Sequence, residues 1–314
     1  MGDIEPQPGG WNLEPGTTIF LTGATGFIGA RLAQALLNAG AEVAALTLPA
    51  EADRLPAGVR GFSGDVCDET AVLQAVQAFR PRMIIHLAAI GVTHPDLPLA
   101  EAIRVNVGGT IHVLNAAGDG GGVQRIVVAG TSYEHGAARN GDGLDPFNAY
   151  SASKVAAWAC ARAAYNAWHA PVVWLRPFQV YGPGQRNAAL IPSAIRAALT
   201  GADFPMTAGE QQRDFIFVDD VVRGFMAAMV APGIEGHALD LGTGILYRVR
   251  DVVTHVWQLA GARGKMRVGV LPYRPGEVPA IRADVEHARQ LLGWQAQVPL
   301  ETGLQRTIEA MNRI

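Results

Sequence analysis

The sequence predicts an α/β protein with a doubly wound parallel sheet and a smaller, interleaved C-terminal lobe. Strand and helix patterns alternate from residue 17 to about residue 178, and most strands are short apolar runs. Strands separated by helices pair in parallel through right-handed crossovers. The 314 residues, 49% of them hydrophobic, supply enough core for such a domain and a partner lobe. Folds of this class bind ligands at the carboxyl ends of the strands.

The first strand and helix are joined by a turn with glycines three residues apart. The run over residues 19–21 is apolar, as expected of a buried parallel strand. Gly23 permits a tight turn, Gly26 lets the backbone approach a pyrophosphate, and Gly29 lets the next helix lie against the strand, as in a Rossmann fold. A glycine-rich turn without a ligand would show the same spacing, but the flanking strand and helix favour dinucleotide binding. We therefore expect cofactor contacts from Gly23, Thr25, Gly26, Phe27, Ile28 and Gly29.

Composition and charge exclude several classes of partner. The formal net charge is −3, and no local basic patch would serve a nucleic acid. No run of about eighteen apolar residues is present to span a membrane, and the N-terminus lacks a signal-peptide pattern. Cys67 and Cys160 have no metal-type spacing, so we expect core thiols, no metal site and a cytoplasmic location. Residues 1–16, rich in proline and glycine, are expected to form a loose leader.

The end of the second strand, over residues 42–48, bears on the type of cofactor. Dinucleotide folds commonly carry an acidic residue there, which binds the adenosine ribose and disfavours a 2′-phosphate. Thr47 and Leu48 occupy those positions here. NADP is therefore not repelled, and Arg54 is a nearby cation for its phosphate, unless Arg54 is a solvated loop residue. Thr47 and Arg54 become cofactor-binding candidates, and the strand end favours NADP over NAD.

The next two strands add residues to the same edge of the sheet. A third strand over residues 59–62 leads to Asp65, which would reach the adenine amino group. A fourth strand over residues 83–87 runs into small alanines that leave room for a ring. His86 lies inside this strand pattern. We interpret it as a hydrogen-bonded core histidine rather than a catalytic one.

A polar strand end and the helix that follows carry the candidate chemistry. The fifth strand, over residues 125–129, ends near Thr131, and a later helix opens with Tyr150, one turn before Lys154. A free tyrosine has a pKa of about 10 and is a poor base at neutral pH. The lysine cation would lower that pKa and make Tyr150 a general acid or base, while the Thr131 hydroxyl holds the substrate oxygen. The Tyr–Lys spacing alone is common, but its position after the glycine turn and the polar strand end is not.

Together these motifs resemble the extended short-chain dehydrogenase/reductases, the nucleotide-sugar epimerase/dehydratase superfamily. The resemblance covers nearly the whole chain after the leader and is more specific for the family than for the reaction. Its markers are residues 23–29, Gly64-Asp65-Val66, His86-Leu87-Ala88-Ala89, residues 106–110, Tyr150 with Lys154, residues 176–184 and residues 213–220.

The resemblance implies roles for single residues. Tyr150 would be the acid/base, Lys154 would also bind the nicotinamide ribose, and Thr131 stands where the family carries serine or threonine. Further implied cofactor contacts are Asp65, Val66, Leu87, Ala88, Ala89 and Asn106. Arginine pairs bidentately with phosphate oxygens, so Arg213 and Arg274 would hold the diphosphate of a nucleoside-diphosphate sugar. The alternative for Arg274 is an ion pair with Glu277. The implied substrate-binding set is Thr131, Ser132, Tyr133, Gln179, Arg213 and Arg274.

Departures from the family pattern bear on the reaction. Members that eliminate water carry an acidic residue two positions after the threonine, where this chain has Tyr133, with Glu134 displaced by one residue. Gln179 stands where asparagine is usual. With Thr47 in the acidic position, these departures favour a 4-ketoreductase, in which nicotinamide hydride reaches C4 of a nucleoside-diphosphate hexose while Tyr150 donates a proton. The alternatives are a 4-epimerase that uses the same residues and, from another class, a dinucleotide-sensing protein without catalysis.

The second half of the chain has a mixed pattern. We expect a dinucleotide-binding domain over residues 17–178, to which residues 214–242 return, and a substrate lobe over residues 179–314. Helices of that lobe are expected over residues 190–199, 248–259, 284–292 and 300–311. The resemblance implies a homodimer through the alanine-rich helices 99–117 and 150–168, although burial under the sheet would explain their alanines equally well.

Overall fold

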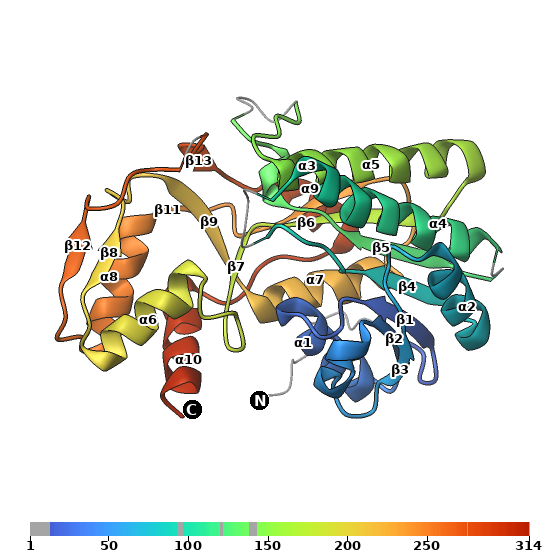
Figure 1. The fold of residues 1–314 in the computed structure, drawn as a ribbon, viewed down its shortest axis with the longest axis horizontal. Coiled ribbons are helices and arrows are strands. Elements are labelled where there is room, and N and C mark those ends of the chain that lie inside the picture. The colour runs from blue at the N-terminus through green and yellow to red at the C-terminus, as the bar shows by residue number, and fades with distance from the viewer. Residues whose placement is uncertain (1–12, 93–96, 120–121, 138–142, 275, 314) are drawn as a thin grey trace.

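The chain is organised around one parallel sheet (Figure 1). The computed structural model describes residues 13–92, 97–119, 122–137, 143–274 and 276–313. Within these residues, a seven-stranded sheet has the order β10-β6-β5-β4-β1-β2-β3, with every pair parallel. The order reverses between β1 and β4, where such folds bind their ligands, so the predicted doubly wound class is confirmed. The strands are β1 (Thr18–Thr22), β2 (Glu42–Thr47), β3 (Arg60–Ser63), β4 (Met83–His86), β5 (Arg125–Ala129), β6 (Val172–Pro177) and β10 (Ala238–Leu241).

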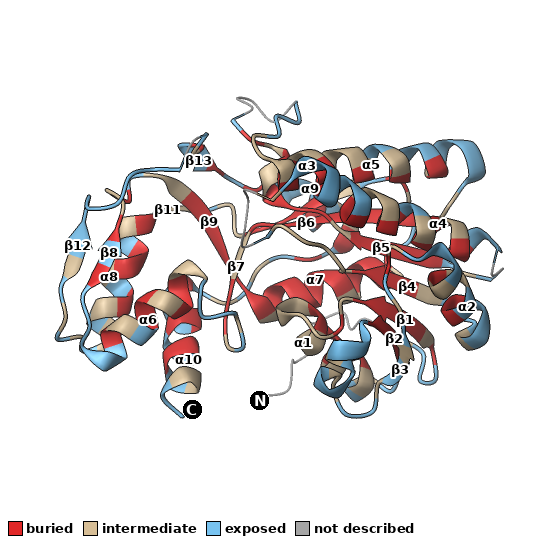
Figure 2. Cartoon of the chain, viewed as in Figure 1, coloured by how far each residue is buried: buried red, intermediate tan, exposed pale blue. Residues whose placement is uncertain are grey.

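Each face of the sheet is covered by its own helices, because side chains alternate along a strand. Ile19 and Leu21 of β1 belong to one buried cluster and Phe20 to another. The first face carries α1 (Phe27–Asn38), α7 (Val218–Val230) and α9 (Val285–Leu292). The second face carries α2 (Glu69–Phe79), α4 (Gly109–Asp119) and α5 (Ala149–Trp168). Figure 2 shows the buried residues following the sheet and the inner sides of these helices.

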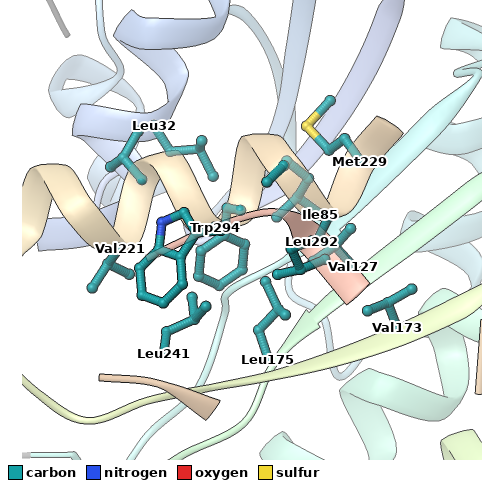
Figure 3. Packing of buried hydrophobic residues seen from close by; sticks show 14 of the residues in the cluster. Leu32, Ile85, Val127, Val173, Leu175, Val221, Met229, Leu241, Leu292 and Trp294 are labelled. Atoms are coloured by element: carbon teal, nitrogen blue, oxygen red, sulfur yellow. The ribbon is translucent and has the colours of Figure 1, made fainter. Parts of the chain in front are cut away.

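Figure 3 shows the packing of the first face. Leu32 of α1, Val221 of α7 and Trp294 lie over Leu175 and Leu241 of the sheet. These five side chains are at most 1% exposed. Burial of a large apolar side chain contributes about 1.5–3 kcal/mol, so this layer is a main source of stability for the sheet and the helices that cover it.

The predicted helix 99–117 is one helical run interrupted by a π-helical turn. It comprises α3 (Leu99–Ala102), the turn η2 (Ile103–Gly108) and then α4. Single π turns inside helices occur frequently at functional sites. Asn106 lies in this turn, which therefore determines where its side chain points.

A second sheet and a helical cluster form the smaller lobe. Strand β9 (Gln212–Phe217) is paired with β7 (Gln179–Tyr181), β11 (Leu246–Arg248) and β13 (Ala280–Ile281). A short pair joins β8 (Phe204–Met206) to β12 (Met266–Val268). The helices α6 (Leu190–Thr200), α8 (Val249–Ala260) and α10 (Leu300–Asn312) contribute to a separate core that includes Tyr181, Phe217, Val253 and Leu304. This lobe stands beside the main sheet in Figure 1.

The boundaries differ from the expected ones in particular places. Residues 1–12 of the expected leader lie outside the described residues, and the Gly16 N–H donates to the Gly40 carbonyl (2.8 Å), which ties the end of that segment to the domain. The return to the main domain begins with α7 rather than at residue 214, because β9 pairs in the second sheet. Helix α9, expected in the smaller lobe, packs into the main core through Ala288 and Leu292. A hydrophobic pattern shows that a segment is buried but not against which sheet.

Candidate active site

The turn after β1 is a close crossing of two backbone segments. Gly23 has a φ of +76°, and a Cβ there would lie 2.8 Å from the backbone nitrogen of Ala88, just after β4. A Cβ on Gly29 would lie 2.1 Å from the Gly23 carbonyl oxygen. Only glycine fits these two positions. Helix α1 begins after Gly26 without a side-chain cap, so its first N–H groups are available to an anion.

The end of β4 forms the wall beside this turn. Leu87, Ala88 and Ala89 follow the strand and are partly exposed. The Ala88 N–H donates to Thr22 Oγ1 (3.2 Å), and that hydroxyl pairs with Nδ1 of His86 (2.7 Å). His86 is completely buried, and burial, followed by the nearby Lys154 cation, lowers its pKa to about 3. The interpretation of His86 as a hydrogen-bonded core histidine is confirmed.

Asn106 supports the site from behind instead of facing the cofactor. Its Oδ1 accepts from the Ile90 N–H (2.9 Å), and its Nδ2 donates to the Ile90 carbonyl (3.1 Å) and to Ser153 Oγ (2.8 Å). Ser153 Oγ in turn donates to the Tyr150 carbonyl (2.7 Å). Asn106 is completely buried and both amide donors are used within the protein, so these contacts do not support the expected direct contact with the cofactor. It joins the loop after β4 to the helix that carries Tyr150.

The adenosine end of the turn contains a carboxylate that the sequence analysis missed. Glu51, in the 3-10 helix η1 (Pro49–Arg54), accepts hydrogen bonds from Thr25 Oγ1 (2.6 Å) and Arg54 Nη1 (2.9 Å). Arg54 Nη2 also donates to the Thr25 carbonyl (3.2 Å). Arg54 is therefore an exposed residue that is ion-paired at the turn and is not a free cation. The sequence contains a signal for this carboxylate: Glu51 lies in the helical turn that begins at Pro49, three residues after Leu48.

The other adenosine-side candidates lie at the ends of β2 and β3. Thr47 is buried as the last residue of β2. Asp65 is exposed after β3, and its carboxylate accepts from the Cys67 N–H (2.9 Å). Val66 is buried beside it. The structure thus brings these residues to the same edge as the glycine turn, while leaving the Asp65 side chain at the rim.

Tyr150 and Thr131 meet at the centre of the site. Tyr150 lies in the first turn of α5, where the N-cap Asn148 accepts from the Ser151 N–H (2.8 Å) in a capping box. Thr131 follows β5 and opens the short 3-10 helix η3 (Ser132–Glu134). The side chains of Tyr150 and Thr131 are hydrogen-bonded to each other, and both residues are at most 8% exposed. Two hydroxyl groups therefore converge where a substrate oxygen would be held.

The surroundings of Tyr150 oppose ionisation of its phenol. Burial raises the pKa of Tyr150, the Thr131 hydrogen bond opposes this, and the nearby Glu134 and Tyr133 add to the rise. The net direction is opposite to the predicted lowering, because loss of hydration on burial outweighs the neighbouring groups. The phenol is therefore held in its protonated form.

Lys154 lies one turn after Tyr150 and is also buried. Its Nζ donates to the Ala129 carbonyl at the end of β5 (2.8 Å) and lies 5.9 Å from the centre of the Trp174 ring. Burial lowers the pKa of Lys154 to about 8, and the Glu134 carboxylate opposes that shift. The ammonium is therefore close to its titration point at neutral pH.

The expected substrate residues come from both the main domain and the smaller lobe. Arg213 of β9, Arg274 and Glu277 all lie close enough to Tyr133 to influence its pKa, which burial raises. The buried Arg213 forms an ion pair with Glu277 and also donates to the Gln212 carbonyl (2.7 Å). The alternative pairing of Arg274 with Glu277 is therefore wrong, and Arg274 is exposed.

Ser132, Tyr133 and Gln179 complete the predicted set. Ser132 is buried beside Thr131, and the ring of Tyr133 packs 5.3 Å from that of Phe147. Gln179 begins β7 and is partly buried. Within the described part of the chain, its side chain makes no hydrogen bond, so its amide remains available to a ligand.

These residues fit a dinucleotide with a polar substrate beside it. The glycine crossing and the uncapped helix suit a pyrophosphate, the small residues after β4 leave space for a ring, and the Tyr150–Thr131 pair stands at the same edge. In the described ranges, no group of three or more histidine, cysteine or acidic side chains is arranged to hold a metal ion. Of the helices described, none has the length and apolar character needed to cross a bilayer.

Comparisons with known proteins agree with this site. Over 92% of this chain and 96% of the relative, the sequence is 32% identical to a UDP-glucose 4-epimerase of Mycolicibacterium smegmatis. It is also 32% identical to a dTDP-glucose 4,6-dehydratase of Streptomyces griseus, over 93% of each chain. The structure is similar to that of MoeE5 in complex with UDP-glucuronic acid and NAD, with 34% identity, a TM-score of 0.84, and coverage of 94% of this chain and 99% of that one.

The family match covers the region that carries the site. Residues 19–242 match the NAD dependent epimerase/dehydratase family, from the first strand through β10. The matched segment contains the glycine turn, the Tyr150–Lys154 pair and Arg213, and so includes every catalytic candidate derived above. The chain therefore belongs to the NAD dependent epimerase/dehydratase family, whose members include nucleotide-sugar epimerases and dehydratases of the extended short-chain dehydrogenase/reductase type.

Proposed function

We propose that the protein transfers a hydride at C4 of a nucleoside-diphosphate hexose, and that it acts as a 4-ketoreductase. The observation that carries this proposal is the buried Tyr150–Thr131 hydroxyl pair at the carboxyl edge of the sheet. Two hydroxyl groups placed together can hold a carbonyl oxygen and supply a proton to it. Tyr133 in place of an acidic residue argues against elimination of water, because no carboxylate stands at that position to remove a carbon-bound proton.

The residues present define how a dinucleotide would be held. Gly23, Gly26 and the N-terminus of α1 would bind its pyrophosphate, Glu51 its adenosine ribose, and Lys154 its nicotinamide ribose. When bound, the nicotinamide supplies a site that gives or accepts a hydride. The family and the NAD-bound MoeE5 structure support NAD(H). A preference for NADP would require Arg54 to leave Glu51.

In the reductive direction, Thr131 and Tyr150 hold the ketone oxygen between their hydroxyl groups. As the carbonyl carbon receives the hydride, its π electrons move to oxygen, and Tyr150 transfers its proton to that oxygen. The product is the alcohol, and the phenolate left on Tyr150 is stabilised by the Lys154 cation until a proton from solvent restores it. Thr131 provides the hydrogen bond that keeps the reacting oxygen within reach.

The substrate would be a nucleoside-diphosphate sugar placed between the two lobes. Arg213 and Arg274 come from the smaller lobe and would bind the diphosphate, while Ser132, Tyr133 and Gln179 would contact the sugar. MoeE5 has been crystallised with UDP-glucuronic acid and also with UDP-glucose, which supports this class of substrate.

A 4-epimerase is the second candidate, supported by the Mycolicibacterium smegmatis relative. The same Tyr150 would accept a proton when the 4-hydroxyl is oxidised, and would return it after the 4-keto sugar has rotated to present its other face.

Exposed apolar residues on one helical face bear on quaternary structure: Leu99, Ile103 and Ile111 are exposed along α3 to α4. This face would form a homodimer with its copy, which sedimentation of the wild type and of Ile111→Glu would test.

One assay separates the two reactions. The purified protein is incubated with UDP- and dTDP-linked hexoses and their 4-keto forms, with and without added NADH or NADPH, and products are identified by mass and NMR. Consumption of one reduced dinucleotide per alcohol formed supports the ketoreductase. Interconversion of C4 epimers by NAD that copurifies, with no added cofactor, overturns it in favour of the epimerase. Tyr150→Phe should lower either rate by about 10²- to 10⁴-fold while dinucleotide still binds, and an unchanged rate contradicts the mechanism.

A further inference from the structure

A buried carboxylate lies directly beneath the catalytic hydroxyl groups. Glu134, at the end of η3, is completely buried. It accepts hydrogen bonds from the Thr131 N–H (2.8 Å), Trp174 Nε1 (3.0 Å) and Arg176 Nε (2.7 Å). In the sequence, Glu134 stands one residue beyond the position where dehydratases of the family carry an acidic residue. In the fold it points into the protein beneath Thr131.

The backbone around Glu134 is shaped to admit it. A Cβ on Gly130 would lie 2.1 Å from Trp174 Nε1 and 2.5 Å from Glu134 Oε1. Any residue larger than glycine at position 130 would therefore displace the carboxylate or the indole. Gly130 separates Thr131 from Ala129, whose carbonyl accepts the hydrogen bond of Lys154. The Glu134 carboxylate consequently lies beneath the segment over residues 129–131 at the end of β5. This segment carries Thr131, and it also binds Lys154 through the Ala129 carbonyl.

Charged groups from several elements surround this carboxylate. Arg176 of β6 pairs with Glu134 and lies 3.9 Å from Asp240 of β10. Asp240 in turn accepts from His135 Nε2 (2.9 Å) and from the Asp284 N–H (3.1 Å). The Arg176 cation therefore faces two carboxylates, Glu134 and Asp240. Of these, Glu134 is the one nearer to the catalytic residues.

On the other side, Glu134 acts on the residues of α5. Burial lowers the pKa of Lys154 to about 8, and the negative charge of Glu134 opposes this. The pKa of Tyr150 is raised by burial first, is lowered by Thr131, and is raised further by Glu134 and Tyr133. His86 of β4 also faces Lys154 but is neutral, because its pKa is lowered to about 3. Glu134 is thus the anion that influences both members of the Tyr–Lys pair.

We propose that Glu134 is a positioning residue of the active site: its buried carboxylate holds Thr131 through the backbone N–H and places a negative charge beside the Tyr150–Lys154 pair. A negative charge stabilises the neighbouring ammonium and destabilises a neighbouring phenolate. If the proposed reduction is correct, the same charge favours Tyr150 as proton donor over Tyr150 as base. That consequence for the direction of catalysis rests on the proposed function, whereas the effect on Lys154 does not.

The test uses the two lysines of the chain, Lys154 and Lys265. With lysine labelled by ¹³C at Cε, the spectrum contains two signals, and the exposed Lys265 is an internal reference. The titration midpoint of Lys154 is measured in the wild type, in Glu134→Gln and in Asp240→Asn. Glu134→Gln keeps an oxygen acceptor for the Thr131 N–H but removes the charge, so the Lys154 midpoint should fall from about 8 by about one pH unit. Asp240→Asn removes a carboxylate from the same arginine and should leave the midpoint nearly unchanged.

Each result decides the proposal. An unchanged Lys154 midpoint in Glu134→Gln, or an equal fall in Asp240→Asn, overturns it. If Glu134→Gln does not fold, Glu134→Asp retains the charge, and its midpoint should remain near that of the wild type; a fall of one unit would contradict the proposal. Because the titration requires neither substrate nor turnover, its outcome is independent of whether the ketoreductase assignment holds. In the active enzyme, Glu134→Gln should also move the alkaline limb of the reduction rate to lower pH by about one unit.

Discussion

The Glu51 carboxylate accepts a hydrogen bond from the Thr25 hydroxyl at 2.6 Å, across 26 residues of chain. This contact places an acidic side chain at the glycine turn although none stands at the end of β2. The carboxylate is also paired with Arg54, so the expected partner of a 2′-phosphate is already engaged. We therefore expect selection between NAD and NADP to depend on these two adjacent side chains of opposite charge.

Replacement of Glu51 by Gln should shift cofactor preference toward NADP. Loss of the carboxylate removes repulsion of a 2′-phosphate and releases Arg54 to bind it. We expect the ratio of NADP to NAD affinity to rise about tenfold, measured by titration of tryptophan fluorescence or by calorimetry. Arg54→Gln is the matched control and should not raise NADP affinity. An unchanged ratio in Glu51→Gln would show that Glu51 does not govern this choice.

Substitution of Arg213 and substitution of Glu277 should have different effects on the KM for the substrate. Arg213→Gln removes a charge-assisted contact to the diphosphate and should raise KM by about 10- to 100-fold with a smaller change in kcat. Glu277→Gln frees Arg213 from its ion pair and should leave KM equal to or below that of the wild type. Steady-state kinetics with the identified nucleotide sugar measures both. Equal rises in KM for the two variants would assign the pair a structural role only.

The depressed pKa of His86 makes folding stability depend on pH. Burial lowers the pKa of His86 to about 3 from a usual value near 6.5. Between those values the unfolded chain binds a proton that the folded protein does not, so stability is full above about pH 6.5 and falls as the pH decreases toward 3. The contribution amounts to at most about 1.4 kcal/mol per pH unit. His86→Asn should flatten this part of the curve obtained from urea unfolding at a series of pH values, and a curve parallel to that of the wild type would refute the assignment.

Gly29 and Gly118 offer a paired test of the glycine turn. An alanine Cβ at Gly29 would lie 2.1 Å from the Gly23 carbonyl oxygen, whereas a Cβ at Gly118 of α4 would have no described heavy atom within 4 Å apart from its chain neighbours and the backbone of its own helix. Gly29→Ala should therefore weaken dinucleotide binding by at least about tenfold and destabilise the protein by about 1–3 kcal/mol. Gly118→Ala should preserve binding and stabilise the helix by about 0.5–1 kcal/mol. Thermal unfolding and dinucleotide titration of both variants measure these effects. Similar behaviour of the two would contradict the close crossing.

Local patterns were sufficient for the parts of the site that lie close together in the chain. Gly23, Gly26 and Gly29 have the spacing that one strand–turn–helix unit requires, and Tyr150 and Lys154 share a helix face because they are one turn apart. The alternation of strand and helix also predicted the class of sheet. Each of these features depends on backbone geometry that repeats over a few residues. The spacing of residue types along the chain therefore predicts that geometry.

The remaining features were decided by the tertiary structure, because they join residues that are distant in sequence. Glu134 meets Arg176 across 42 residues, and Arg213 meets Glu277 across 64, so residue order does not reveal either contact. The predicted lowering of the Tyr150 pKa was wrong for the same reason, since the degree of burial depends on all the layers around the phenol. The amino-acid sequence alone therefore determined the scaffold and the candidate reacting groups, whereas packing of distant segments decided the burial and the partners of these groups.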